Sequence, residues 1–412
     1  MYDWAVLEAW IEFAVRWTHV ITAVAWIGSS FYFIALDLGL RKTPDLPPGA
    51  YGEEWQVHGG GFYHVQKYLV APDRLPDHLI WFKWESYATW LSGFALLILV
   101  YYLGAELYLV DPTVADLAVW QAVLISLASL TFGWLAYDTL CKSRFGDDNT
   151  RLMVLLYVIL VAMAWGYTQV FSGRAALLHL GAFTATIMSA NVFMIIMPNQ
   201  RIVVADLKAG RVPDPKYGRI AKQRSTHNNY LTLPVLFLML SNHYPLAFAT
   251  QYNWIIASLV FLMGVTIRHY FNSRHAGKGN PTWTWAVTAI LFLIIAWLST
   301  APMRTAEPEA QLQGAALTYA SASGFDEVTT IVQGRCSMCH AAEPVWDGML
   351  WPPKGVVLET PAQIAREARR IYLQAGVSHA MPPANLSYME PQERAAIVRW
   401  FQGAGAASGV AG

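Results

Sequence analysis

The sequence predicts an all-α protein in which an eight-span transmembrane helical bundle precedes a soluble C-terminal domain. Of the 412 residues, 55% are hydrophobic and only 14% are charged, whereas a soluble globular domain has roughly 25% charged residues. Apolar stretches near or above the ~20 residues needed to cross a bilayer recur through the first 300 positions. After Pro302 no such stretch occurs, and the composition becomes that of a soluble domain.

The apolar stretches are too long and too closely spaced for a soluble helical bundle. They cover residues 8–38, 83–104, 117–140, 151–171, 175–197, 229–250, 253–272 and 282–302. The first stretch carries Glu8, Glu12 and Arg16 and has no basic segment before it. We therefore interpret it as a retained transmembrane helix rather than a cleaved signal peptide.

Basic residues are concentrated in alternate connections between these stretches. Seventeen Lys and Arg residues lie in or beside the connections at 39–82, 141–150, 198–228 and 273–281. The connections at 105–116 and around residue 251 have none, and the turn at 172–174 has only Arg174. By the positive-inside rule the basic connections are cytoplasmic. An even number of spans then places both termini and the C-terminal domain outside.

The change in composition after Pro302 predicts three parts of the chain. A transmembrane domain occupies residues 1–302, an Ala-, Glu- and Gln-rich linker occupies 303–316, and a soluble domain occupies 317–412. The 28 Lys and Arg residues balance 28 Asp and Glu residues, and only three Cys are present. This composition excludes a disordered chain, a nucleic-acid-binding protein and a disulfide-stapled secreted module.

The soluble domain contains a C-x-x-C-H sequence, Cys336-Ser337-Met338-Cys339-His340, which is the attachment site of a c-type haem. Two thiols one helical turn apart reach the two vinyl groups, and His340 then directs its imidazole to the iron. The other interpretations are a chance match, a redox C-x-x-C pair and half of a zinc site. The zinc interpretation lacks the second pair of Cys residues that it requires. We expect one covalent haem c bound through Cys336, Cys339 and His340.

A sixth iron ligand is expected downstream, and a thioether ligand raises the reduction potential of the iron. Met381 lies 41 residues after His340 on the Pro-stiffened loop His379–Pro383, ahead of an expected helix at 391–401. It is preferred to the alternatives His379, Met349 and Met389. From an expected helix at 325–333 onwards the tail resembles class I cytochrome c. Haem c is attached outside the cytoplasm, which agrees with the orientation that the loop charges predict.

Five histidines lie in or at the edges of the predicted transmembrane helices, where polar groups are costly and each is a functional candidate. His19, His179 and His243 are expected in the outer half of the membrane, and His227 and His269 near the inner face. Three interpretations stay open. The histidines hydrogen-bond helices together, serve as axial ligands of a haem b, or bind and deprotonate a substrate. The outer three are candidate haem b ligands because they lie on the side of the haem c domain.

Nearly the whole chain resembles the bacterial membrane-bound, cytochrome c-linked urate oxidases (urate hydroxylases). The likeness rests on Trp17-Thr18-His19-Val20 followed by Ala25–Phe33, on Gly59–Tyr63 followed by Trp81–Glu85, and on the layout of spans and haem c domain. The opening motif is also similar to the first span of membrane protoporphyrinogen oxidases, in which a comparable histidine serves haem b.

The resemblance implies oxidation of urate to 5-hydroxyisourate in the bacterial inner membrane, with both termini and the cytochrome c domain periplasmic. Water supplies the hydroxyl group, and electrons leave through haem c to a downstream cytochrome c or terminal oxidase of the respiratory chain. The substrate is known only from this resemblance. The alternative is a non-catalytic membrane electron-transfer subunit that links a quinol donor to a terminal oxidase. A transporter with a fused cytochrome is a third interpretation.

Urate is a planar monoanion, and its oxidation requires a cation or amide partners, an aromatic surface and a base. The candidate catalytic residues are the inner-facing His227, Asn228, Asn229 and His269. The outer Arg16 and His19 are the alternative set. We favour the inner set because the product is catabolised in the cytosol in many bacteria.

Overall fold

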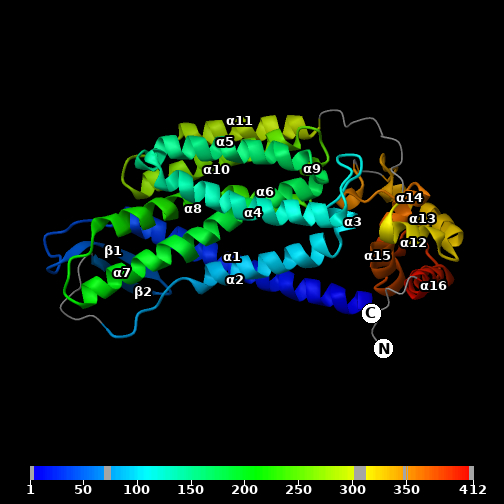
Figure 1. Ribbon diagram of the computed structural model, residues 1–412, viewed down its shortest axis with the longest axis horizontal. Helices are drawn as coiled ribbons and strands as arrows, with labels where there is room; N and C mark the ends of the chain where they lie inside the picture. Colours follow the sequence, from blue (N-terminus) through cyan, green and yellow to red (C-terminus); the bar gives the residue numbers. More distant parts are fainter. Residues whose placement is uncertain (1–3, 69–75, 301–311, 347–348, 350, 408–412) are drawn as a thin grey trace.

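Long helices that run alongside one another form the body of the molecule in the computed structural model (Figure 1). The structure describes residues 4–68, 76–300, 312–346, 349 and 351–407. The longer helices of the body are α1 (Trp4–Gly39), α2 (Trp84–Leu96), α4 (Val119–Lys142), α5 (Asn149–Thr168), α6 (Gly173–Ala190), α7 (Met197–Lys208), α8 (Pro215–Ser241), α10 (Asn253–His275) and α11 (Trp283–Ser299). Short helices α3 (Ala105–Tyr108) and α9 (Pro245–Phe248) lie in connections.

Two π-helical segments and one 3₁₀ turn modify this arrangement. The π-helical segment Leu97–Tyr102 extends α2, and the segment Asn191–Ile196 joins α6 to α7 in one continuous helix. A 3₁₀ turn, Arg144–Asp147, precedes α5. Pro198 explains the second π segment, because a proline has no N–H to donate and its ring clashes with the carbonyl four residues earlier.

Several helices are long and apolar enough to cross a membrane. Five meet both criteria within the described residues: Trp4–Gly39, Val119–Lys142, Asn149–Thr168, the continuous Gly173–Lys208, and Asn253–His275. The predicted span at 282–302 corresponds to α11, an apolar helix of 17 residues. The predicted spans at 83–104 and 229–250 correspond to α2 with its π extension and to α8, which are not among the five.

Helix α8 differs most from its predicted counterpart, because it begins at Pro215 instead of near residue 229. Asp214 caps it, its carboxylate accepting the Lys216 amide at 2.8 Å. The polar segment that hydropathy assigns to a connection is therefore helical, and α7 reaches Lys208 from the other side. The connection predicted at 198–228 shrinks to residues 209–214.

The core of the bundle surrounds α6, which packs on α4, α5 and α8. Two close approaches depend on glycine. A Cβ on Gly133 of α4 would lie 2.0 Å from a ring carbon of Phe183 on α6. A Cβ on Gly264 of α10 would lie 2.6 Å from Cδ of Pro234, the proline inside α8. Both glycines let neighbouring helices pack where a larger residue would clash.

A β-hairpin interrupts the expected all-α fold. Strand β1 (Ala50–His58) pairs with antiparallel β2 (Gly61–Tyr68) across a turn at Gly59 and Gly60. These glycines have φ of 59° and 78°, as a two-residue hairpin turn requires. Trp55 stacks on His64 at 4.1 Å between ring centroids, a cross-strand pair that stabilises the hairpin. The Gly-rich segment is thus a hairpin turn.

The C-terminal domain has its own hydrophobic core. Its helices are α12 (Gly314–Ser321), α13 (Phe325–His340), α14 (Pro361–Arg366), α15 (Ala368–Ile371) and α16 (Pro391–Ala407), with 3₁₀ turns at Pro353–Gly355 and Pro383–Asn385 and a π turn at Tyr372–Val377. Helices α13 and α16 pack on each other, and Phe325 stacks on the buried Trp400 at 5.7 Å. Of the predicted linker, residues 303–311 lie outside the described residues, and 314–316 already belong to α12.

The C-terminal domain lies at one end of the bundle, beside the start of α1, and the hairpin and α7 lie at the opposite end (Figure 1). Ala5 of α1 is buried in the core of the C-terminal domain. Glu8 forms an ion pair of 3.3 Å with Arg369, and the Glu106 carboxylate accepts the Ala315 amide at 2.8 Å. These contacts seat the domain on the bundle.

Candidate active site

A cluster of buried polar side chains joins α4, α6 and α8. His227, Asn228 and Asn229 are 1%, 5% and 1% exposed. Buried polar groups are costly unless they are hydrogen-bonded, so the hydrogen-bond partners of these three side chains define the structure of the cluster.

His227 is anchored through one ring nitrogen. Its Nδ1 lies 2.7 Å from the hydroxyl oxygen of Tyr137 on α4. That hydroxyl also accepts the side-chain amide of Asn191 at 3.1 Å, and the same amide donates to Oδ1 of Asn228 at 3.0 Å. Asn228 in turn donates to the carbonyl of Met188 at 2.9 Å. Asn191, the first residue of the π-helical segment, is therefore the hub that ties α4, α6 and α8 together.

Arg224 completes this side of the cluster. It is 1% exposed, although hydropathy assigns it to a cytoplasmic connection, because α8 begins earlier than predicted. Its guanidinium donates to Asp138 at 2.7 Å and to Asn191 Oδ1 at 3.2 Å, and it lies over the Tyr137 ring at 4.9 Å. The spacing of Arg224, His227 and Asn228 puts all three on one helical face, the only signal in the sequence that could have included the arginine.

Asn229, also on α8, makes its hydrogen bonds to residues of α10. Its Oδ1 accepts Nε of Arg268 at 3.3 Å and Nδ2 of Asn272 at 2.9 Å. Arg268 is 6% exposed, and its guanidinium lies 4.0 Å from the centroid of the Phe31 ring of α1. Its neighbour His269 is exposed and lies against Trp283 at 6.1 Å between ring centroids. The structure thus brings His227, Asn228 and Asn229 together, with Arg268 rather than His269 from α10.

Three buried polar atoms of this cluster have no hydrogen-bond partner among the described residues. They are Nε of Arg224, Nε2 of His227 and Nδ2 of Asn229. Unpartnered buried polar groups are rare in folded proteins. Arg224 and His227, three residues apart, share one face of α8, whereas Asn229 faces α10. Each of the three atoms can form one further hydrogen bond. Polar clusters beside π-helical segments are frequent at functional sites.

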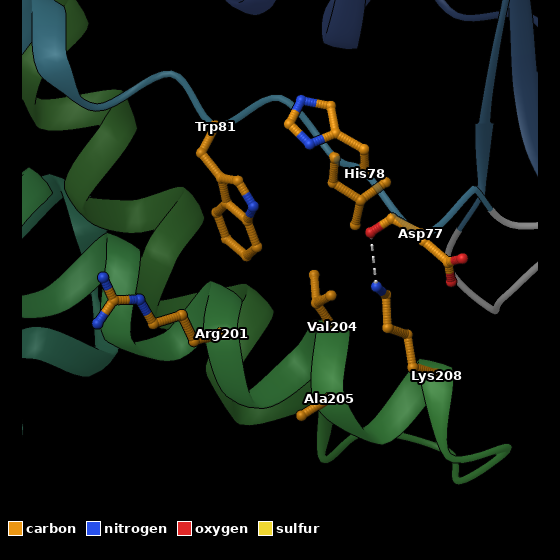
Figure 2. A pocket seen from close by; sticks show the side chains of 8 residues that line it. Asp77, His78, Trp81, Arg201, Val204, Ala205 and Lys208 are labelled. Carbon is orange, nitrogen blue, oxygen red and sulfur yellow. Dashed lines mark hydrogen bonds between the residues drawn. The ribbon is translucent and has the colours of Figure 1, made fainter.

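A separate hollow of about 400 Å³ lies at the end of the bundle that carries α7 (Figure 2). Arg201, Val204 and Lys208 line it from α7, and His78 and Trp81 line it from the connection before α2. Lys208 donates to the carbonyl of Asp77 at 3.2 Å. This hollow is exposed and cationic, whereas the His227 cluster is closed to solvent.

The three outer histidines occupy different environments. His19 is half-buried, and its Nδ1 lies 3.0 Å from the Thr89 carbonyl on α2, an arrangement that leaves Nε2 as the atom with the lone pair. Gly93 makes room for this ring, since a Cβ there would lie 2.9 Å from it. His179 is fully buried, with Nδ1 2.8 Å from the Ala175 carbonyl and Nε2 2.9 Å from the Ser126 hydroxyl. His243 is exposed after the end of α8.

The C-x-x-C-H sequence forms the last turn of α13. Cys336 and Cys339 are free thiols. Burial raises the pKa of the Cys336 thiol to about 12 and also raises that of Cys339, so both are protonated at neutral pH. Nδ1 of His340 lies 2.9 Å from the Val356 carbonyl, the arrangement that orients a metal-ligating imidazole through its other nitrogen. These residues could hold a haem attached to both thiols with Nε2 of His340 towards the iron.

Met381 packs on the same core as Cys336, on the loop before α16. Its backbone amide donates to the Gln374 carbonyl at 2.9 Å, and its carbonyl accepts the buried Arg394 at 2.8 Å. Of the other candidate ligands, Met389 is 2% exposed within the core and His379 is exposed.

No curated protein and no solved structure matches the chain. The model of a family described as urate oxidase N-terminal matches residues 5–299, which include every residue of the His227 cluster. Because that match covers more than half of the chain, the protein belongs to the urate oxidase N-terminal family, which implies an oxidoreductase acting on urate.

Proposed function

We propose that the protein is a membrane-bound urate oxidoreductase that passes electrons to a covalent haem c in its own C-terminal domain. Urate and one water molecule give 5-hydroxyisourate, two protons and two electrons. The observation that carries this proposal is the presence on one chain of a urate oxidase N-terminal region, residues 5–299, and a C-x-x-C-H turn with an oriented histidine.

The His227 cluster is the proposed catalytic site. In the tautomer whose Nδ1–H donates to Tyr137, Nε2 of His227 carries a lone pair and accepts a proton from bound urate. The unpartnered Nε–H of Arg224 binds an oxygen atom of the anion, and the unpartnered amide of Asn229 offers a donor on the α10 side of α8. Asn228 holds Asn191 and through it Tyr137 in place. Two electrons leave the deprotonated ring, and water then adds to C5, which their loss has made electron-poor, with release of a proton. His269, one residue from Arg268 on α10, remains the fourth proposed residue and acts at the edge of this site.

The proposed cofactor site of the C-terminal domain is formed by Cys336, Cys339, His340 and Met381. The two thiols and the fixed ring of His340 fit a covalently attached haem, and Met381 is the proposed further ligand of its iron. A haem c held by these residues would supply one-electron redox chemistry. Arg394 acts as a positioning residue, because it holds the carbonyl of Met381 and so the loop that carries the thioether.

A haem b in the bundle is a further part of the proposal. The helices of the His227 cluster lead away from the C-terminal domain (Figure 1), so an electron carrier is needed between that cluster and the haem c. His19 fits best as its ligand, since its Nδ1 is held by Thr89 and Nε2 is left for a metal. His179 would have to release Ser126 to become a ligand, and His243 would have to turn inward.

The proposed topology is that of a multi-pass protein of the bacterial inner membrane. Helices α2 and α8 and the shorter α11 join the five long apolar helices as spans, giving eight. The basic connections face the cytoplasm, and both termini and the C-terminal domain face the periplasm. A downstream cytochrome c or terminal oxidase receives the electrons there.

The purified full-length protein tests this function against that of an electron carrier. Anaerobic addition of urate should reduce the haem of the wild-type protein, and a pyridine haemochrome spectrum should count one haem c and show whether haem b accompanies it. Reduction by a quinol but not by urate would contradict the enzyme and support a non-catalytic carrier. A spectrum of haem c alone would remove the haem b relay.

A further inference from the structure

A cavity of about 680 Å³ lies where the C-terminal domain meets the bundle. The bundle contributes residues of α3, the turn before α6, and the segment from α9 to α10. The C-terminal domain contributes Lys354, Gly355, Glu367 and Arg370. It lies at the end of the molecule away from the hollow on α7 and is separate from the His227 cluster.

The lining carries more positive charge than its carboxylates compensate. Arg370 is paired with Glu367 at 3.2 Å. The carboxylate of Asp111 accepts hydrogen bonds from the backbone amide and the hydroxyl of Thr113, at 3.0 and 2.6 Å. Across the described ranges, neither Arg174 nor Lys354 forms an ion pair with a carboxylate, and Nε of Arg174 is buried without a hydrogen-bond partner. Three cations and two carboxylates line the cavity, so its net charge is +1, and Arg174 and Lys354 are the cations without a carboxylate partner.

An aromatic surface lies beside these cations. Tyr108 has the guanidinium of Arg174 at 5.1 Å and that of Arg370 at 4.9 Å from its ring centroid. Phe171 and Trp254 line the same space. The Tyr108 ring thus holds two guanidinium groups in fixed positions, and a guanidinium so held can bind oxygen atoms at the edge of a planar ligand.

Two long helices begin at the cavity. They are α6, which begins at Gly173, and α10, which begins at Asn253. The first residues of both helices line the cavity. Helix N-termini carry partial positive charge and free N–H groups, which adds to the effect of Arg174 and Lys354. The side chains of Gln169 and Gln251 supply amide groups in the same lining.

We propose that this cavity is a second ligand site, which binds a small planar organic anion and fastens the C-terminal domain to the bundle. The anion class is a ring with amide and oxo edges and one negative charge. Such a ligand contacts Arg174 from the bundle and Lys354 from the C-terminal domain at once, so its binding energy adds to the few direct contacts between the two parts. The site is independent of where urate is oxidised.

The cavity borders the turn that orients His340. Gly355 lies in the lining, and the next residue, Val356, accepts the hydrogen bond of the His340 ring at 2.9 Å. The amide of Leu358 donates to the carbonyl of His340 at 2.7 Å. A bound anion therefore restricts the segment 354–358 and the histidine that depends on it.

Orotate and uracil are a matched pair of probes, because they share one ring and only orotate carries a carboxylate. Isothermal titration calorimetry on the full-length protein should show orotate binding and no uracil binding. Arg174→Gln and Lys354→Gln should each weaken orotate binding by about tenfold or more, since each removes a charged partner. Arg219→Gln, an exposed change on α8, is the control and should leave it unchanged. Hydrogen exchange of residues 354–358 should slow when orotate binds.

Three results would overturn the proposal: no orotate binding, equal binding of orotate and uracil, or unchanged binding in Arg174→Gln and Lys354→Gln. Urate-dependent haem reduction in Arg174→Gln separates this site from the catalytic one. Reduction retained there agrees with two sites. Loss of both orotate binding and haem reduction in that variant would place urate oxidation in this cavity and overturn the independence of the two sites.

Discussion

The hydroxyl oxygen of Tyr137 lies 2.7 Å from Nδ1 of His227, across 90 residues of sequence. The contact fixes the ring of His227. The other ring nitrogen, Nε2, has no hydrogen-bond partner among the described residues. In metal and acid–base sites alike, the partner of one ring nitrogen sets what the other can do.

His227→Ala should therefore abolish most urate-dependent haem reduction, by roughly 100-fold or more, the usual contribution of a general base. Tyr137→Phe keeps the ring and removes only the hydroxyl, and should cost about 10-fold to 100-fold. Stopped-flow spectroscopy with urate measures both. Tyr157→Phe, which removes a hydroxyl 3.4 Å from the Ser258 carbonyl, is the control. Equal rates in Tyr137→Phe and Tyr157→Phe would count against the His227 site.

Arg224 should be essential for stability as well as for binding. Arg224→Gln removes the buried cation that Asp138 contacts at 2.7 Å, while Asp138 keeps Lys142 as its other partner. The loss should therefore be smaller than the roughly 3–5 kcal/mol of a fully buried ion pair. Thermal unfolding in detergent should show a decrease in the midpoint. Arg219→Gln on the exposed side of α8 should change it little. A similar midpoint for both variants would mean that Arg224 is not held as described.

Met381→Ala should lower the reduction potential of the haem, because loss of a thioether ligand removes the group that raises it. Met349→Ala is the matched control and should leave the potential unchanged. A redox titration of the full-length protein followed by absorbance compares the two. If Met349→Ala lowered the potential and Met381→Ala did not, the proposed ligand would be wrong.

Gly264→Ala should destabilise the bundle. The added methyl group would lie 2.6 Å from Pro234 of α8, and overpacking of this kind typically costs about 1–3 kcal/mol. Gly166→Ala on α5 is a control with open space around the new methyl group, and should be neutral or stabilising by about 0.5–1 kcal/mol. Unfolding midpoints of the two variants in the same detergent give the comparison.

Hydropathy was sufficient for the helices that contain a long apolar window, such as α4, α5 and α10. It was misleading for α8, whose first half carries Lys216, Arg219 and Arg224 and was assigned to a loop. That segment is helical because Asp214 and Pro215 start it and because α4 and α6 supply partners for Arg224. Hydropathy does not indicate the β-hairpin, because its two strands contain no long apolar stretch and pair only with each other.

The candidate site was predictable only within one segment. His227, Asn228 and Asn229 are adjacent in the sequence, and their density of hydrogen-bonding groups marked them. Tyr137 and Asn191 are 90 and 36 residues away from His227, and nothing local identifies them as its partners. The sequence also indicated His269 and not its neighbour Arg268, because one residue along a helix changes the face by about 100° and hydropathy does not show which face is inward.

An anaerobic titration of the full-length protein with urate tests the central claim most directly. Oxidation of urate to 5-hydroxyisourate releases two electrons, so each urate should reduce two equivalents of haem, seen as the growth of the reduced haem band without any oxygen. A haem that stays oxidised after excess urate, or that is reduced only by a quinol, would contradict the account.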